Sequence, residues 1–120
     1  MKKRLMILFA TIIVAVFAAN ADIYFRGSVG KYGVGGSIGL YNGGYVSGNY
    51  GYNGHSGSLN LSGSWWSIGN NKYKVTMTET DSKGKVSGSW NLVYNSNNRS
   101  FTGTMTNSKG KTYKVNLKGR

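Results

Sequence analysis

Apolar and polar residues alternate with a period of two over most of the chain after residue 44. In the segment KYKVTMTET, Tyr73, Val75 and Met77 fall on one face, while lysines and threonines occupy the other. The segments SLNLSGSW, KVSGSWNLVY and TYKVNLK repeat the pattern, and in the second of them Val86 and Trp90 are placed inward. Such alternation is typical of strands with one solvated face, and it predicts an antiparallel sheet.

Polar segments rich in Gly and Asn separate the alternating runs. DSKGK (81–85) and NSKGK (107–111) are near copies, in which Asp or Asn opens a turn and Gly supplies a positive φ three residues later. With the other turn segments they divide the chain into about eight strands. The expected strands span residues 23–30, 32–40, 45–52, 58–66, 72–80, 85–94, 100–106 and 112–118.

One five-residue pattern, with a central Gly between polar residues and outer apolar ones, occurs five times. Its five copies are FRGSV, VSGNY, LSGSW, VSGSW and FTGTM. Residues two apart share a face of a strand, so each glycine lies inward between two large side chains, where a missing side chain lets the sheet bend sharply. The bends are expected at Gly27, Gly48, Gly63, Gly88 and Gly103. Together they predict an all-β fold, a single small antiparallel up-and-down barrel, because closure removes the free edges of the sheet.

The glycines placed two residues before an aromatic, as in LSGSW and VSGSW, give the chain a resemblance to avidin-like and lipocalin-like barrels. The run from VSGNY to FTGTM also resembles a group of small exported bacterial β proteins of unassigned function. The likeness covers about residues 25–118 and implies a shape rather than a ligand. Avidins surround their ligand with several tryptophans and a buried acid, whereas Glu79 and Asp81 are expected here at the end of a hairpin, with Asp81 capping the turn.

Residues 1–21 have the features of a cleaved signal peptide. A basic MKKR start precedes an apolar run from Leu5 to Phe17, and AANA closes the segment. The small residues Ala19 and Ala21 predict cleavage after the second of them. The apolar run is shorter than the roughly 20 residues that a membrane-spanning helix needs. We therefore expect an exported protein, periplasmic or extracellular, that has no membrane span after processing.

The predicted barrel domain, residues 22–120, is strongly basic, because its 12 lysines and arginines against three acids give a net charge of +9. This charge favours an anionic polymer or envelope surface as partner, such as lipopolysaccharide, teichoic acid or an acidic glycan. Export argues against cytosolic nucleic acid. Alternate turns of an up-and-down barrel share an end, so the two lysine-bearing turns form one cationic rim, together with the loop that carries His55. The candidate anion-binding residues are Lys83, Lys85, Lys109 and Lys111.

The opposite end of the predicted barrel gathers turns rich in Asn and offers an alternative site. A neutral sugar bound there would stack on inner aromatic rings and form hydrogen bonds with amides. The residues of this alternative mouth are Asn70, Asn71, Asn95, Asn97, Asn98, Trp65 and Trp90, beside Tyr94.

Residues suited to catalysis or metal binding are sparse. His55 is the single histidine, and one histidine with three acids does not make a strong metal site. A Ser–His–Asp triad would depend on tertiary contacts that the spacing does not indicate. The sequence therefore predicts no enzyme, no cofactor and no metal. It favours an exported basic binding module for an anionic envelope component or glycan, and the alternative is a secreted bacteriocin-like antagonist that acts on other cells.

Overall fold

The structure is a computed structural model, and it describes residues 21–120. These residues form eight strands, close to the predicted bounds. The strands are β1 (Ala21–Val29), β2 (Tyr32–Tyr41), β3 (Tyr45–Tyr52), β4 (Leu59–Gly69), β5 (Lys72–Thr80), β6 (Val86–Asn95), β7 (Ser100–Asn107) and β8 (Thr112–Gly119). The Gly-rich β2 keeps a continuous register with β1, from Ala21 opposite Leu40 to Val29 opposite Tyr32.

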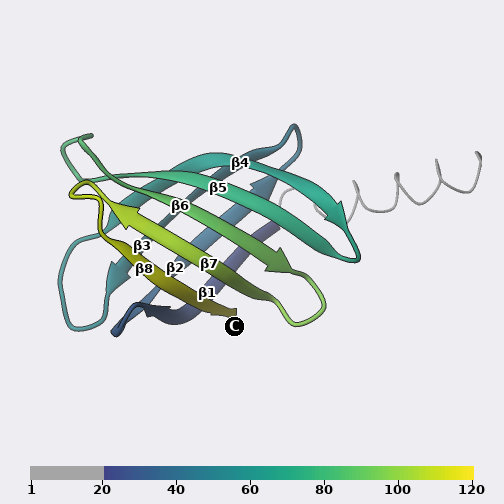
Figure 1. The fold of residues 1–120 in the computed structure, drawn as a ribbon, viewed down its shortest axis with the longest axis horizontal. Coiled ribbons are helices and arrows are strands. Elements are labelled where there is room, and N and C mark those ends of the chain that lie inside the picture. Colours follow the sequence, from purple (N-terminus) through teal and green to yellow (C-terminus); the bar gives the residue numbers. More distant parts are fainter. Residues whose placement is uncertain (1–20) are drawn as a thin grey trace, which may run out of the picture.

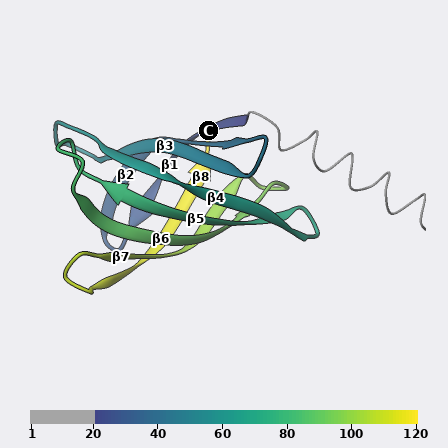
Figure 2. The same ribbon diagram turned by 90° about the horizontal axis from the view of Figure 1, so that it is seen from above.

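The strands form a closed barrel in chain order, and every neighbouring pair is antiparallel (Figures 1 and 2). The barrel is closed by pairing of β1 with β8, in a register that places Gly27 opposite Leu117. The β1–β2, β3–β4, β5–β6 and β7–β8 connections lie at one end, and the other connections lie at the opposite end (Figure 1). The predicted all-β up-and-down barrel is therefore confirmed.

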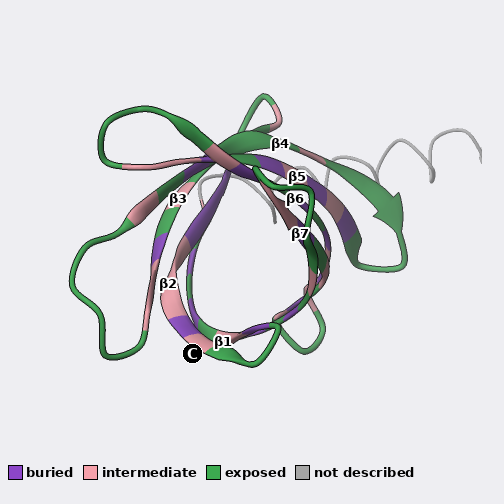
Figure 3. Cartoon of the chain, turned by 60° about the vertical axis from the view of Figure 1, so that its left-hand side comes forward, coloured by how far each residue is buried: buried purple, intermediate pink, exposed green. Residues whose placement is uncertain are grey.

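The interior of the barrel is filled by the inward side chains of the alternating runs. Val75, Leu92 and Val115 are completely buried, and buried and exposed residues alternate along several strands (Figure 3). The rings of Tyr94 and Phe101 lie with their centroids 4.5 Å apart. The buried apolar face predicted from the period of two is thus the core of the barrel.

Four of the five pattern glycines lie where neighbouring strands approach too closely for a side chain. A Cβ atom at Gly27, Gly48, Gly63 or Gly103 would overlap a backbone carbonyl oxygen of the paired strand. Gly88 differs, because a Cβ there would lie 3.1 Å from the Thr106 carbonyl oxygen and 3.4 Å from the Met105 sulfur. Neighbouring strands therefore lie too close for a side chain at four of the predicted positions and less close at the fifth. Gly63 is exposed, so it is not enclosed by the interior as predicted.

The prediction that Val86 points inward is wrong, since this side chain is 56% exposed. The reason is a register shift between β5 and β6, where Glu79 lies opposite Gly88 but the next residue, Thr80, lies opposite Val86. One additional residue on β6, Ser87, interrupts the alternation, as expected for a β-bulge. The bulge turns Val86 to solvent and brings the Ser87 hydroxyl to Glu79.

Residues 1–20 of the predicted signal peptide, including the cleavage residue Ala19, lie outside the described residues. Ala21 is described and is the first residue of β1, opposite Leu40. Within residues 21–120, no helix has the length and apolar character needed to cross a membrane.

Candidate functional site

The β5–β6 and β7–β8 turns share one geometry, which places four lysines at the same end of the barrel. In each turn, the side-chain oxygen of the first residue accepts hydrogen bonds from the backbone N–H groups two and four residues later. The pairs are Asp81 with Lys83 and Lys85, and Asn107 with Lys109 and Lys111, at 2.9 to 3.0 Å. These backbone hydrogen bonds hold the pKa of Asp81 below its ordinary value. The two near-copied sequences therefore fold as two copies of one turn.

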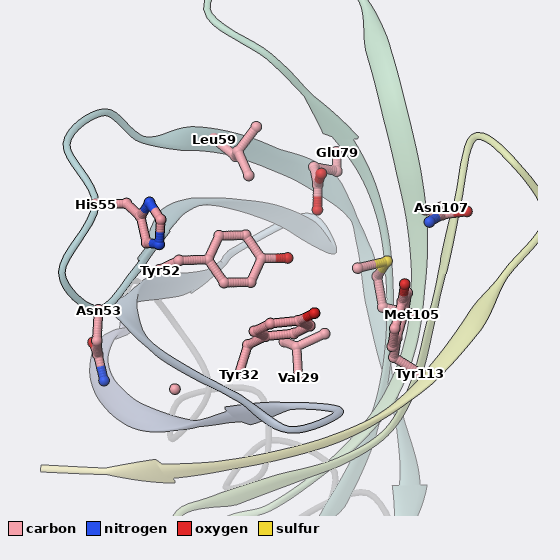
Figure 4. Close-up of a pocket in the computed structure, with 11 residues that line it drawn as sticks. Val29, Tyr32, Tyr52, Asn53, His55, Leu59, Glu79, Met105, Asn107 and Tyr113 are labelled. Carbon is pink, nitrogen blue, oxygen red and sulfur yellow. The ribbon is translucent and has the colours of Figure 1, made fainter.

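A cavity of about 470 Å³ lies at this same end of the barrel (Figure 4). Its size falls within the range of small-molecule pockets, roughly 300–1,000 Å³. Its walls come from the β1–β2, β3–β4 and β7–β8 regions and from the end of β5. The lining residues are Val29, Tyr32, Gly33, Tyr52, Asn53, His55, Leu59, Glu79, Met105, Asn107 and Tyr113. Most of this surface is apolar or aromatic, and Glu79 supplies a carboxylate.

Glu79 is the one buried charged side chain among residues 21–120, with 4% of its surface exposed. Its Oε1 accepts hydrogen bonds from the Tyr50 hydroxyl at 2.6 Å and from Trp90 Nε1 at 2.9 Å. Its Oε2 accepts one from the Ser87 hydroxyl at 2.7 Å. Buried carboxylates are costly unless such donors satisfy them, so this network fixes the side chain at one position in the cavity wall.

The hydroxyl of Tyr50 is held in its protonated, donating form. Burial first, and then the hydrogen bond to Glu79, raise the pKa of Tyr50 far above its ordinary value. The Tyr50 hydroxyl also lies 3.3 Å from that of Tyr52, whose ring lines the cavity. The carboxylate network therefore continues into the aromatic wall.

Tyrosine rings form much of this wall. The ring centroids of Tyr32 and Tyr52 lie 6.1 Å apart and their planes are nearly perpendicular, at 89°. Two lysines lie over such rings. The Nζ of Lys31, in the β1–β2 turn, is 5.6 Å from the centroid of Tyr32, and the Nζ of the rim residue Lys111 is 5.5 Å from that of Tyr113. Positive charge and aromatic surface are therefore interleaved at this end of the barrel.

The predicted rim residues lie on the turns at the cavity end, and all of them are exposed; they are Lys83, Lys85, Lys109 and Lys111. None of these four lines the cavity, whereas His55, on the β3–β4 loop, does. The structure thus places the predicted rim beside a cavity that the sequence did not predict.

The amide-rich end is organised differently from the prediction. Its asparagines are exposed or half-buried; they are Asn70, Asn71, Asn95, Asn97 and Asn98. The side chains of the last four form hydrogen bonds with a neighbouring turn or within their own turn. Trp65 lies at this end, where its Nε1 donates to the Tyr41 carbonyl oxygen at 2.9 Å. Trp90 does not join it, because its Nε1 donates to Glu79 at the cavity end. A smaller cavity of about 260 Å³ at the amide-rich end is lined by Tyr94, which was predicted there, but by none of the predicted asparagines or tryptophans.

Glu79 is the functional candidate that sequence reasoning missed, since it was expected at the solvated end of a hairpin. A signal was present: Glu79 continues the inward series of Tyr73, Val75 and Met77 with the same period of two. Asp81, by contrast, caps its turn as expected.

Two further searches found no match. Among residues 21–120, no group of three or more His, Cys, Asp and Glu side chains is arranged to hold a metal ion. In comparisons with known proteins, no family model, no curated protein and no solved structure matched this chain.

Proposed function

We propose that this protein is an exported binding module that engages an anionic envelope component or acidic glycan with the cavity end of its barrel. The observation that carries the proposal is the coincidence of two features at one end: the rim lysines and the 470 Å³ cavity. An anionic group can contact the rim while a neighbouring part of the same ligand enters the cavity.

The charge distribution supports an anionic partner. The acid nearest to the rim lysines in sequence, Asp81, is engaged by the backbone N–H groups of its own turn. Single exposed lysines contribute only about 0–1 kcal/mol each. Several lysines around one opening can still give useful avidity toward a repeating polymer.

A binding role is favoured over a catalytic one by the state of Glu79. Both of its oxygens accept hydrogen bonds from groups of the barrel wall, which suits a fixed recognition element. The resemblance to avidin-like and lipocalin-like barrels agrees with this role, because barrels of this size can hold one small ligand in their interior.

The proposal is tested with two variants of equal charge change. In the rim variant, Gln replaces Lys83, Lys85, Lys109 and Lys111. In the wall variant, Gln replaces Lys72, Lys74, Lys114 and Lys118, which lie on strands. Both are screened against lipopolysaccharide, teichoic acid, peptidoglycan and a glycan array at two salt concentrations, with circular dichroism to confirm the fold.

We expect the rim variant to lose most of its binding and the wall variant to lose little. Binding by the unmodified protein should weaken as salt rises past physiological strength, where the Debye length falls below ~8 Å. Unchanged affinity in the rim variant, with little salt dependence, would refute the cationic rim. The amide-rich end would then become the leading site.

A further inference from the structure

The cavity holds a carboxylate and several tyrosine rings close together, which is a different chemistry from that of the rim. We propose that the cavity is a subsite for an organic ammonium group, and that the ligand at this end is a zwitterion whose anionic group contacts the rim lysines. The ammonium subsite is inferred from the cavity alone, whereas the contact of the ligand's anionic group with the rim lysines rests on the function proposed above.

The aromatic wall is suited to a cation that is weakly hydrated. Ammonium groups are attracted to the faces of tyrosine rings, and quaternary ammonium groups are commonly held in cages of such rings. Tyr32, Tyr52 and Tyr113 line the cavity, together with the apolar Leu59 and Met105 (Figure 4). The apolar side chains can contact the methyl groups of a quaternary ammonium, which has no N–H groups that need partners.

Glu79 supplies the complementary charge. Its hydrogen-bond partners, Tyr50, Ser87 and Trp90, are all uncharged, so they orient the carboxylate without neutralising it. A buried charge is expensive in an apolar setting, and replacing a buried polar network with apolar residues is often neutral or stabilising. A bound cation would provide the counter-charge that these three partners do not.

The rim narrows the class of ligand. A free organic cation would be repelled by the positive charges of Lys31 and Lys111, whose Nζ atoms lie over rings of the cavity lining. A zwitterion has an anionic group that these lysines attract and an ammonium group that Glu79 attracts. The ligand class is therefore a compound with a quaternary ammonium and a nearby phosphate or carboxylate, as in phosphocholine and betaines.

Three probes separate the two halves of the proposal: choline carries only the cation, inorganic phosphate only the anion, and phosphocholine both. Binding to the full barrel domain is measured by calorimetry and by tryptophan fluorescence, because Trp90 contacts Glu79 directly. We expect phosphocholine to bind about tenfold or more tightly than either single probe, since both charges are then matched.

The principal variant is Glu79→Gln, which keeps an oxygen for the Tyr50 and Trp90 donors and places an amide toward the Ser87 hydroxyl. It should weaken choline and phosphocholine binding about tenfold or more, because it removes a desolvated charge. Phosphate binding should be unchanged. Tyr32→Leu provides a second variant that is safe for the fold, since Tyr32 is 49% exposed, and Tyr45→Leu at the opposite end, with 68% exposure, is its matched control.

The outcomes are distinct. The ammonium subsite is refuted if choline and phosphocholine fail to bind, or if they bind folded Glu79→Gln with unchanged affinity. The proposed function would still stand in that case if the unmodified protein binds phosphate and the rim variant does not. If choline binding depends on Glu79 but the rim variant retains full preference for phosphocholine, the subsite stands and the cationic rim fails. Cosedimentation with phosphatidylcholine vesicles, compared with binding of free phosphocholine, distinguishes a lipid head group from a soluble or glycan-borne one.

Discussion

Gly63 provides the most direct test of how the barrel closes. A Cβ atom at this position would overlap the carbonyl oxygen of Thr76 and lie 2.8 Å from the Cα of Met77. Both atoms belong to the backbone of β5, so a rotamer change cannot relieve the clash. The change Gly63→Ala must instead separate β4 from β5 where Gly63 pairs with Met77.

The expected cost follows from this geometry. Forcing added atoms into space that other atoms occupy typically costs about 1–3 kcal/mol, and a domain of this size loses about 4–8 °C in melting temperature per kcal/mol. We therefore expect Gly63→Ala to melt roughly 5–20 °C lower than the unmodified protein. At Gly88 the nearest atom, the Thr106 carbonyl oxygen, lies 3.1 Å from the added Cβ, so Gly88→Ala should cost less than about 1 kcal/mol.

Gly35 is the matched control, because it also lies within a strand but has room for a side chain. An added Cβ would meet only the Phe25 carbonyl oxygen, at 3.6 Å. Gly35→Ala should be neutral or stabilising, since alanine loses less conformational freedom on folding. The three variants are compared by thermal and urea unfolding monitored by circular dichroism. Equal melting temperatures for Gly63→Ala and Gly35→Ala would refute the claim that the missing side chain permits the close approach of β4 and β5.

Three further predictions follow from other features. Intact-mass measurement of the exported protein should show a chain that begins at Asp22; a chain that keeps the apolar run and stays with membranes would contradict export as a processed protein. The lowered pKa of Asp81 means that its contribution to stability is present above its ordinary pKa of 3.8 and is lost as pH falls through the lower, folded-state value. Amide protection, measured relative to the intrinsic exchange rate at each pH, should therefore fall in the β5–β6 turn as pH drops below the ordinary value of 3.8, but not in the β7–β8 turn or after Asp81→Asn. Finally, Tyr50→Phe removes one of three donors to Glu79 and should cost about 1.5–3 kcal/mol in urea unfolding; no loss would show that the buried network contributes nothing.

The strands could be predicted from the sequence because each has one buried face, which leaves a period of two in the residues. Even the Gly-rich β2 was located, since turn residues bound it on both sides. The exposed Val86 could not be predicted, because a bulge is a property of how β5 and β6 pair and not of β6 alone.

The cavity was beyond sequence reasoning for a related cause. Its walls join Tyr32 and Tyr113, which are far apart in the chain and meet only because β1 pairs with β8. The Glu79 network likewise depends on β3 and β6 facing each other across the interior, where Tyr50 and Trp90 converge on one oxygen. The inward position of Glu79 could be predicted from the alternating pattern of β5, but its hydrogen-bond partners could not.

The pairing of β1 with β8 also governs how the protein can fold. The first and last strands of the barrel must pair with each other, so the barrel cannot close until its whole sequence is present. Contacts between residues so far apart in the chain form slowly. Until then both strands present unpaired edges, which are templates for aggregation. Arg26 and Lys118 lie directly opposite each other at this seam, and Lys114 lies further along β8. Like charges weaken the finished seam slightly, but they also repel the same edge of a second chain, which disfavours edge-to-edge aggregation before the barrel closes.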